Sequence, residues 1–330
     1  MILAGIDEAG YGPLLGPLVV GCCAFELPCA DPPVAADGDA PPCVWKFLRK
    51  CVSKSRTKDG RRLHVNDSKL VYSPAGGLKE LERSILAIAT TLDGTWPDSL
   101  DALLRRTAAH AVPDVATYPW YDPVWDAGRW PIEQDALPVQ LVANGLKAEM
   151  HRTGVRCAHL AARVVCERQF NQMVNATRNK ASALFSTAAV HLDHLIRTYG
   201  ERDLTIFCDR QGGRERYGHL LRLMFDEWDL TIVEELDGRS EYVLSRNGHD
   251  VRILFREKAE AQCLPVAVAS MLSKYLREAL MRRFNNYWQS LLPELAPTAG
   301  YYGDGSRFLS DIDAKRRELG IGDEQLVRCR

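Results

Sequence analysis

The segment ILAGIDEAGYGPLLGPLVVGCCAF, residues 2–25, constrains the fold more than any other part of the chain. Two apolar runs, ILAGI and PLVVGCCAF, flank a stretch rich in glycine and proline, which predicts two strands joined by a turn. Asp7 and Glu8 directly follow the first run. Two adjacent carboxylates at the end of a buried strand repel each other and lose water, and both effects cost free energy. The acid pair therefore needs a compensating partner.

Two more acids lie in comparable positions. Asp209 ends the apolar run DLTIFCD, and Glu260 comes between the run VRILF and a long predicted helix over 264–288. Strands alternating with helices predict an α/β fold with a mixed sheet. If the first strand and the strand ending at Asp209 are neighbours, their acids converge at the edge where such sheets bind ligands. Four carboxylates suit hard divalent cations, and a two-cation site is typical of phosphoryl-transfer enzymes.

Composition excludes several classes of protein. The 330 residues are 46% hydrophobic and 26% charged, with a net charge of −1, so any nucleic-acid contact must come from a local basic surface. The ten cysteines show no zinc-finger spacing, which predicts buried free thiols in a reducing compartment. Neither a membrane-spanning segment nor a signal peptide is recognisable. We expect a cytoplasmic protein that does not contact a membrane.

We expect one catalytic domain over residues 1–330, with insertions at about 29–62 and 93–150 and a C-terminal segment, 286–330, packed near the active site. The basic stretch at 45–64 fits a solvated surface and a phosphate-facing patch about equally well. The aromatic stretch YPWYDPVWDAGRWP in the second insertion suggests a surface lobe. Packing of its rings onto the body of the protein is favoured over a base-stacking platform. A single long helix is expected over 170–200.

At several positions the sequence resembles the type 2 ribonucleases H, the ribonuclease HII/HIII family. GIDEAGYGPLLGPLVV is similar to the first family motif, Asp-Glu-Ala-Gly-Arg-Gly-Pro, and NDSKL to the family's Asp-Ser-Lys motif. Further similar segments follow in family order: VVCERQFNQMVNAT, IFCDRQGGRERYG, EKAEAQCLPVAVASMLSKYLRE and AGYYGDGSRFL. One such motif is weak support for a relationship, whereas six in order are specific.

The resemblance implies a ribonuclease-H-like fold, in which a mixed central sheet is flanked by helices and followed by a C-terminal helical segment. It implies an endonuclease that cleaves the RNA strand of RNA–DNA hybrids, or ribonucleotide-containing DNA, with two Mg²⁺ or Mn²⁺ ions, leaving 5′-phosphate and 3′-hydroxyl ends. We expect a monomer. The implied metal-binding and catalytic acids are Asp7, Glu8, Asp209 and Glu260. The implied substrate-binding residues are Gly10, Tyr11 and Gly12 at the ribose, Tyr301 stacked on a neighbouring sugar, and Lys69, Lys258 and Lys274 near phosphates.

The sequence departs from the family pattern at informative positions. Tyr11 replaces the arginine of the first motif, which removes a phosphate contact, and the fourth acid is Glu260, as in type III members. Glu278 follows Arg277 where the family has Asp, and its spacing predicts a structural ion pair with Arg282. Two alternatives remain: a nuclease of the same fold that acts on branched DNA, and a non-catalytic hybrid-binding protein. The presence of all four acids argues against the second alternative.

Overall fold

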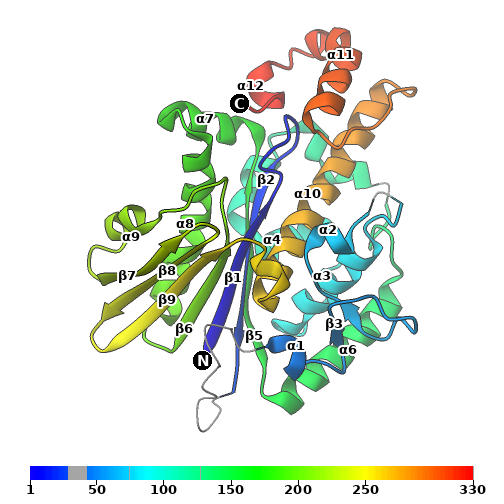
Figure 1. The fold of residues 1–330 in the computed structure, drawn as a ribbon. Helices are drawn as coiled ribbons and strands as arrows, with labels where there is room; N and C mark the ends of the chain where they lie inside the picture. Colours follow the sequence, from blue (N-terminus) through cyan, green and yellow to red (C-terminus); the bar gives the residue numbers. More distant parts are fainter. Residues whose placement is uncertain (29–42, 74, 127, 330) are drawn as a thin grey trace.

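The computed structural model describes residues 1–28, 43–73, 75–126 and 128–329. Its centre is a seven-stranded mixed sheet with the strand order β5-β2-β1-β6-β9-β8-β7 (Figure 1). The strands are β1 (Ile2–Ala9), β2 (Leu18–Glu26), β5 (Arg156–Val165), β6 (Leu204–Asp209), β7 (Asp229–Leu236), β8 (Arg239–Arg246) and β9 (His249–Arg256). Short strands β3 (Val52–Ser53) and β4 (Leu63–His64) form a separate parallel pair.

Strand directions complete the topology of the sheet. β1 and β6 are parallel, as are β6 and β9, whereas β2 is antiparallel to both of its neighbours. Among the five adjacent strands β5, β2, β1, β6 and β9, only β2 is therefore antiparallel to the others. The predicted fold class, an α/β mixed sheet flanked by helices with a C-terminal helical segment, is confirmed. The arrangement is the ribonuclease-H-like fold that the sequence resemblance implies.

Helices cover both faces of the central sheet. The principal α-helices are α3 (Lys79–Thr91), α4 (Leu100–Thr107), α6 (Ala136–Thr153), α7 (Glu167–Thr177), α8 (Lys180–Tyr199), α9 (Gly218–Met224), α10 (Leu264–Leu291) and α11 (Tyr302–Glu318). Short elements are α1 (Val44–Phe47), α2 (Ser68–Val71), α5 (Val112–Val115), α12 (Asp323–Leu326), η1 (Ala109–Ala111), η2 (Pro119–Tyr121), η3 (Pro123–Asp126) and η4 (Ala259–Ala261).

α10 packs closely on one face of β1 and β2, and α8 lies on the other face (Figure 1). Two glycines allow the close approach of α10. A Cβ on Gly5 would lie 2.1 Å from the backbone nitrogen of Val266, and one on Gly21 would lie 2.4 Å from the carbonyl oxygen of Ala269. Neither distance is sterically allowed, so both positions require glycine. The helix that carries the predicted substrate-binding residue Lys274 is thereby held tightly against the strand that carries Asp7 and Glu8.

Two elements differ from the sequence expectation. The single helix predicted over 170–200 is two helices, because Arg178 has a left-handed backbone (φ 50°) and Asn179 starts α8 by accepting hydrogen bonds from the next turn. β8 was not predicted. It forms a hairpin with β9 through Asn247 and Gly248, both of positive φ, and this Asn-Gly pair is a recognised hairpin signal.

The described part of the second insertion packs into the body of the protein. Trp120 is fully buried, and its ring contacts those of Phe284, Tyr287 and Trp288 on α10. The buried guanidinium of Arg283 pairs with two insertion carboxylates: its Nη2 lies 2.8 Å from Asp101 Oδ2 and 2.5 Å from Asp126 Oδ2. The packing interpretation of the aromatic stretch is therefore confirmed, and the surface-lobe expectation is wrong for these rings.

The first insertion is described in part. Residues 29–42 lie outside the described residues, and 43–62 contain α1 and β3. The nine cysteines within the described ranges are free thiols, as predicted. Among the helices described, none combines the length and the apolar character needed to cross a membrane.

Candidate active site

The predicted acids gather at the carboxyl edge of the three parallel strands. Ile6 of β1 is in register with Cys208 of β6, so the next residues along, Asp7 and Asp209, lie side by side. β1 continues to Ala9, which places Asp7 and Glu8 within the strand and not after its end as the sequence suggested. Glu260 lies in η4, just after β9. The backbone N–H of Ala259 donates to Asp209 Oδ1 at 3.2 Å, which ties η4 to the end of β6.

Burial raises the pKa values of all four acids, and repulsion from neighbouring carboxylates raises those of Asp7, Glu8 and Glu260 further. Burial is the largest cause in each case. The neighbouring charges of Glu8 and Asp209 raise the pKa of Asp7 further, and it lies well above the ordinary value. The pKa of Glu8 rises to about 8, and that of Glu260 rises to about 7. Four carboxyls that resist ionisation together form a site that favours either protons or cations.

The donor set fits divalent metal ions. Glu8 Oε2 and Glu260 Oε2 are buried, and neither has a hydrogen-bond partner among the residues that the structure describes. A buried carboxylate oxygen without a partner costs free energy, which an oxygen-seeking cation would recover. Asp7 and Asp209 add carboxylate oxygens at the same strand edge. Asp7, Glu8, Asp209 and Glu260 are therefore the residues that could hold Mg²⁺ or Mn²⁺.

The NDSKL segment is linked to the acids through Ser270 of α10. The hydroxyl of Ser270 on α10 lies within hydrogen-bond distance of that of Ser68, at 3.0 Å, and donates a hydrogen bond to the side chain of Asp7. Lys69, although exposed, is close enough to lower the pKa values of Glu8 and Asp209. Its predicted position near the site is consistent with this geometry.

Asp67 is a fifth acid that sequence reasoning missed. Its charge raises the pKa of Glu260, so it faces the same cluster. Its side chain accepts from the backbone N–H of Lys69 at 2.9 Å and begins α2. The available signal was its place in the NDSKL motif, two residues before Lys69.

The loop after β1 is held by two arginines from distant parts of the chain. Arg328 donates to the carbonyl oxygens of Gly10 (2.5 Å) and Tyr11 (2.8 Å). Arg277 of α10 donates to the carbonyl oxygen of Leu15 at 3.3 Å. Sequence reasoning missed both roles, because a contact across some 260 to 320 residues leaves no local pattern.

The two predicted loop glycines have different reasons to be glycine. Gly10 has a φ of +84°, and a Cβ there would lie 2.6 Å from both Arg277 Cδ and the carbonyl oxygen of Pro17. Its small size is therefore required by packing. Gly12 is exposed, and a Cβ there would meet none of the described atoms within 4 Å. Only Gly12 lies in open space that a substrate could enter.

Tyr11 lies among cationic side chains. Lys180 Nζ is 5.2 Å from the centre of its ring, and the charges of Arg214 and Arg328 act on its hydroxyl. Burial nevertheless raises the pKa of Tyr11, with the Glu8 carboxylate as the next cause. Three cations from other segments thus surround the position where the family motif has arginine.

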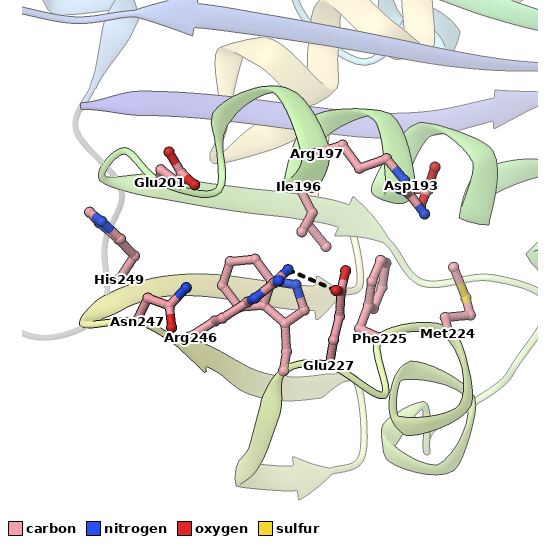
Figure 2. A pocket seen from close by; sticks show the side chains of 11 residues that line it. Asp193, Ile196, Arg197, Glu201, Met224, Phe225, Glu227, Arg246, Asn247 and His249 are labelled. Carbon is pink, nitrogen blue, oxygen red and sulfur yellow. Dashed lines mark hydrogen bonds and ion pairs between the residues drawn. The ribbon is translucent and has the colours of Figure 1, made fainter.

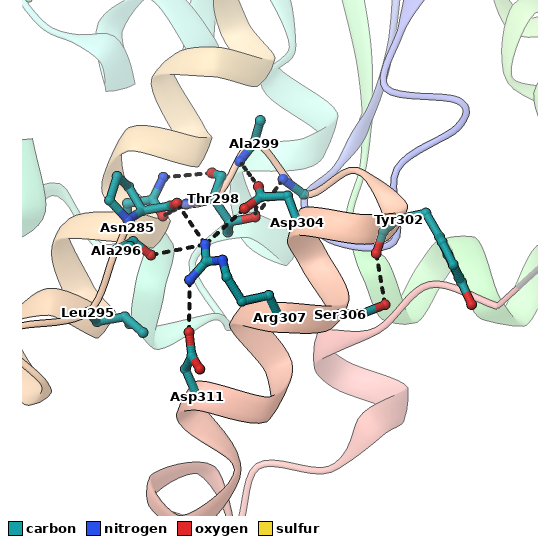
Figure 3. A network of polar contacts seen from close by, with 12 residues as sticks. Asn285, Leu295, Ala296, Thr298, Ala299, Tyr302, Asp304, Ser306, Arg307 and Asp311 are labelled. Atoms are coloured by element: carbon teal, nitrogen blue, oxygen red, sulfur yellow. Dashed lines mark hydrogen bonds and ion pairs between the residues drawn. The ribbon is translucent and has the colours of Figure 1, made fainter.

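Tyr301 lies beside the same loop. Gly300 accepts hydrogen bonds from the backbone N–H groups of Leu14 (2.8 Å) and Leu15 (3.2 Å), and Tyr301 next to it is 52% exposed. A polar network fixes this segment: Asp304 accepts from Thr298 at 2.5 Å and from the N–H of Ala299 at 2.9 Å (Figure 3). Arg307 pairs with Asp304 at 2.8 Å (Figure 3). The C-terminal segment therefore contacts the loop that follows the acids.

The two remaining predicted lysines differ in their surroundings. Lys274 Nζ donates to Glu278 at 2.8 Å and lies 4.5 Å from the ring centre of Tyr72. Lys258 is exposed at the start of η4, two residues before Glu260. The predicted pairing of Glu278 with Arg282 is wrong: Glu278 pairs with Lys274 and Arg277 instead, and Arg282 lies 3.8 Å from a carboxylate oxygen of Glu133.

The described part of the basic stretch borders the acids. Lys54 Nζ donates to the carbonyl oxygen of Ala261 at 2.7 Å, next to Glu260, and lies 4.3 Å from the ring centre of Trp45. The carbonyl oxygen of Lys54 in turn accepts from the side chain of Asn66 at 2.9 Å. These contacts place one end of the basic stretch beside the acid cluster.

A pocket of about 340 Å³ lies at the opposite end of the sheet. Its lining includes Glu201, just before β6, and His249, at the start of β9 (Figure 2). Arg246 and Glu227 form an ion pair of 2.9 Å across it (Figure 2). The acids lie at the other ends of β6 and β9, so this pocket is not part of the candidate site.

No protein-family model and no curated protein matches the sequence. Similar solved structures include a chain of the PCNA:RNase HII complex from Archaeoglobus fulgidus, with 14% identity, a TM-score of 0.41, and coverage of 100% of this chain and 95% of that one. Ribonuclease H2 from Pyrococcus horikoshii OT3 has 12% identity, a TM-score of 0.38, and coverage of 99% and 92%. Bst-RNase HIII in complex with Mn²⁺ has 12% identity, a TM-score of 0.41, and coverage of 99% and 66%. Function has to be inferred from the acid cluster itself.

Proposed function

We propose that this chain is a type 2 ribonuclease H that cleaves the RNA strand of RNA–DNA hybrids. The observation that carries the proposal is the parallel register of β1 and β6, which brings Asp7 beside Asp209 at the edge reached by Glu260. Raised pKa values and unpartnered carboxylate oxygens make this cluster suited to two divalent cations, Mg²⁺ or Mn²⁺. All four acids come from one chain, so a monomer would be sufficient.

Bound cations would stabilise the attacking and leaving oxygens of an in-line phosphodiester hydrolysis, which leaves 5′-phosphate and 3′-hydroxyl ends. The four carboxylates would hold the cations, and Asp67 would add negative charge beside Glu260. Lys69, which already acts electrostatically on Glu8 and Asp209, would contact the phosphate chain.

The surrounding surface suits a nucleic-acid backbone. Gly12 lies open beside the acids, so its backbone could approach a ribose 2′-hydroxyl. Half-exposed Tyr301 could stack on a neighbouring sugar. Lys180 near Tyr11, and Lys274 and Lys258 near η4 and α10, would add local positive charge on a chain whose net charge is −1.

A cleavage assay with three labelled substrates tests the proposal: a uniform RNA–DNA hybrid, a DNA duplex with one ribonucleotide, and a four-way DNA junction. Each is incubated with Mg²⁺ or Mn²⁺. We expect cleavage of the hybrid and loss of that activity in Asp7→Asn, by more than the roughly 100-fold that removal of an outer-shell partner costs. Glu201→Gln, an exposed acid at the far end of the sheet, is the matched control and should retain activity.

The other outcomes identify the alternatives. Cleavage of the junction without cleavage of the hybrid would indicate that the acids form the active site of a nuclease that acts on branched DNA. Binding of the hybrid without turnover under either metal would indicate a non-catalytic hybrid-binding protein. Full activity in Asp7→Asn would remove this residue from the site.

A further inference from the structure

A second cluster of metal-ligating side chains lies apart from the acids. Cys22 of β2, His159 of β5 and His191 of α8 offer one ligand atom each, and these atoms all lie within 4.8 Å of one another. Cys22 is in register with Ile6, and its side chain belongs to the core between the sheet and α8. Asp7, the next residue of β1, alternates to the face covered by α10, where the hydroxyl of Ser270 hydrogen-bonds it. The two clusters therefore use different side chains on different faces of the sheet.

The two imidazoles are oriented as in a metal site. His191 Nε2 is 3.0 Å from the carbonyl oxygen of Val20, which can only accept, so Nε2 carries the proton and Nδ1 is free to bind. Metal-binding histidines commonly donate their second ring nitrogen to a carbonyl in this way. His159 Nε2 is buried and makes no hydrogen bond within the described chain. A buried nitrogen without a partner is costly, and a metal ion would satisfy it.

Two neighbouring groups complete the surroundings. The exposed His194, one turn after His191 on α8, stacks on His159 with ring centres 4.4 Å apart. His194 is not among the side chains whose ligand atoms come together, so a water molecule would supply a fourth ligand. Arg163 lies close enough to oppose a positive charge on His191. A bound cation therefore needs the negative charge of a Cys22 thiolate beside it.

We propose that Cys22, His159 and His191 bind a zinc ion that links β2, β5 and α8. One thiolate and two imidazoles are ligands that Zn²⁺ accepts, whereas Mg²⁺ and Mn²⁺ prefer the oxygen ligands of the acid cluster. Binding forms a Zn–S bond and releases the thiol proton to solvent. The site is structural, because it joins two strands and a helix by side chains that are mostly buried. It does not depend on the proposed nuclease activity.

Metal content and cobalt substitution test the proposal. The full chain, purified with excess Mg²⁺ present, should contain one zinc per chain by elemental analysis. After removal of zinc by a chelator, Co²⁺ should restore occupancy and give thiolate-to-cobalt charge-transfer absorption. Zinc at roughly a hundred times its dissociation constant should raise the melting temperature of the metal-free chain by about 5 °C.

Adjacent cysteines give matched variants. Cys22→Ala should lose the zinc and the cobalt absorption, whereas Cys23→Ala, which removes a buried thiol from the opposite face of β2, should keep both. His159→Asn, at a half-buried position, should weaken binding even if Cys22→Ala fails to fold. Absence of zinc from the purified chain together with no cobalt absorption on titration would overturn the proposal. So would unchanged cobalt absorption in His159→Asn and Cys22→Ala.

Discussion

Without divalent metal, the acid cluster should make the folded protein less stable as pH rises from 6.5 to 8. Burial raises the pKa of Glu8 from 4.5 to about 8, and that of Glu260 to about 7. In this pH range the folded chain holds more protons at these groups than the unfolded chain does. The free energy of unfolding then falls with rising pH, because each ionisation must overcome repulsion that exists only in the folded state.

The size of the effect follows from the two pKa values of Glu8. The whole rise of the Glu8 pKa, from 4.5 to about 8, corresponds to a loss of at most about 5 kcal/mol in the free energy of unfolding. Only part of it falls between pH 6.5 and 8, and the four acids share their protons, so we expect Glu8 to account for about 1–2 kcal/mol. Buried histidines act in the opposite direction: burial lowers the pKa values of His110 and His159 to about 4 and that of His191 to about 3, so their stabilising contribution rises with pH until about one pH unit above 6.5, and it is the same in every variant compared.

Urea unfolding in a metal chelator, followed by the fluorescence of the seven tryptophans, measures this loss. Glu8→Gln should remove about half or more of the pH dependence and should be more stable than the unmodified chain at pH 8. Glu167, whose pKa burial raises to about 7, titrates in the same range but is present in both proteins and cancels from the comparison. Glu201→Gln should behave as the unmodified chain. If the free energy of unfolding fell equally steeply with pH in Glu8→Gln and in the unmodified chain, the reasoning would be refuted.

Three further predictions concern turnover and packing. Glu260→Gln should reduce hybrid cleavage at saturating metal by more than about 100-fold, and Glu278→Gln, which acts only through Lys274 and Arg277, by less than about tenfold; the reverse order would mean that the fourth acid is misassigned. The unmodified chain should cleave long RNA tracts faster than a single ribonucleotide embedded in DNA. Tyr11→Arg should reduce this difference in cleavage rate, because arginine adds a two-point phosphate contact. Equal cleavage rates on the two substrates for the unmodified chain would contradict this prediction. Trp120→Ala should lower the free energy of unfolding by about 3–5 kcal/mol, measured by urea denaturation, since it empties a fully buried ring site; a loss below about 1 kcal/mol would mean that the insertion does not pack as described.

Four acids of the cluster could be placed at one edge of the sheet from the sequence because each lies at or just after the end of an apolar run, although β1 continues past Asp7 and Glu8, and Asp67 was missed. Strand pattern indicates where a chain is buried, and parallel strands bring their carboxyl ends to one edge. The same reasoning predicted the fold class. It failed locally at Arg178, because helix periodicity continues across the break and a left-handed residue leaves little trace in composition.

Long-range contacts lay beyond sequence reasoning. Packing of the aromatic insertion onto the body was the favoured prediction and is confirmed, but the sequence did not indicate that α10 is the element that buries Trp120. Arg283 is a comparable case, since nothing near it in the sequence indicates that its partners are Asp101 and Asp126. The clustering of Cys22 with two histidines likewise depends on strand register, which a single sequence does not specify.

The hydrogen bond from Arg328 to Gly10 joins residues 318 positions apart, and it bears on when the site can form during translation. Asp7 leaves the ribosome early, but the loop beside it cannot be locked until residue 328 has emerged. At about 5–20 residues per second, synthesis of that length takes roughly 15–65 seconds. A nascent chain stalled near residue 300 would already contain all four acids, yet its glycine loop would lack this clamp. We therefore expect the proposed nuclease activity to begin only after Arg328 has emerged and bound the loop.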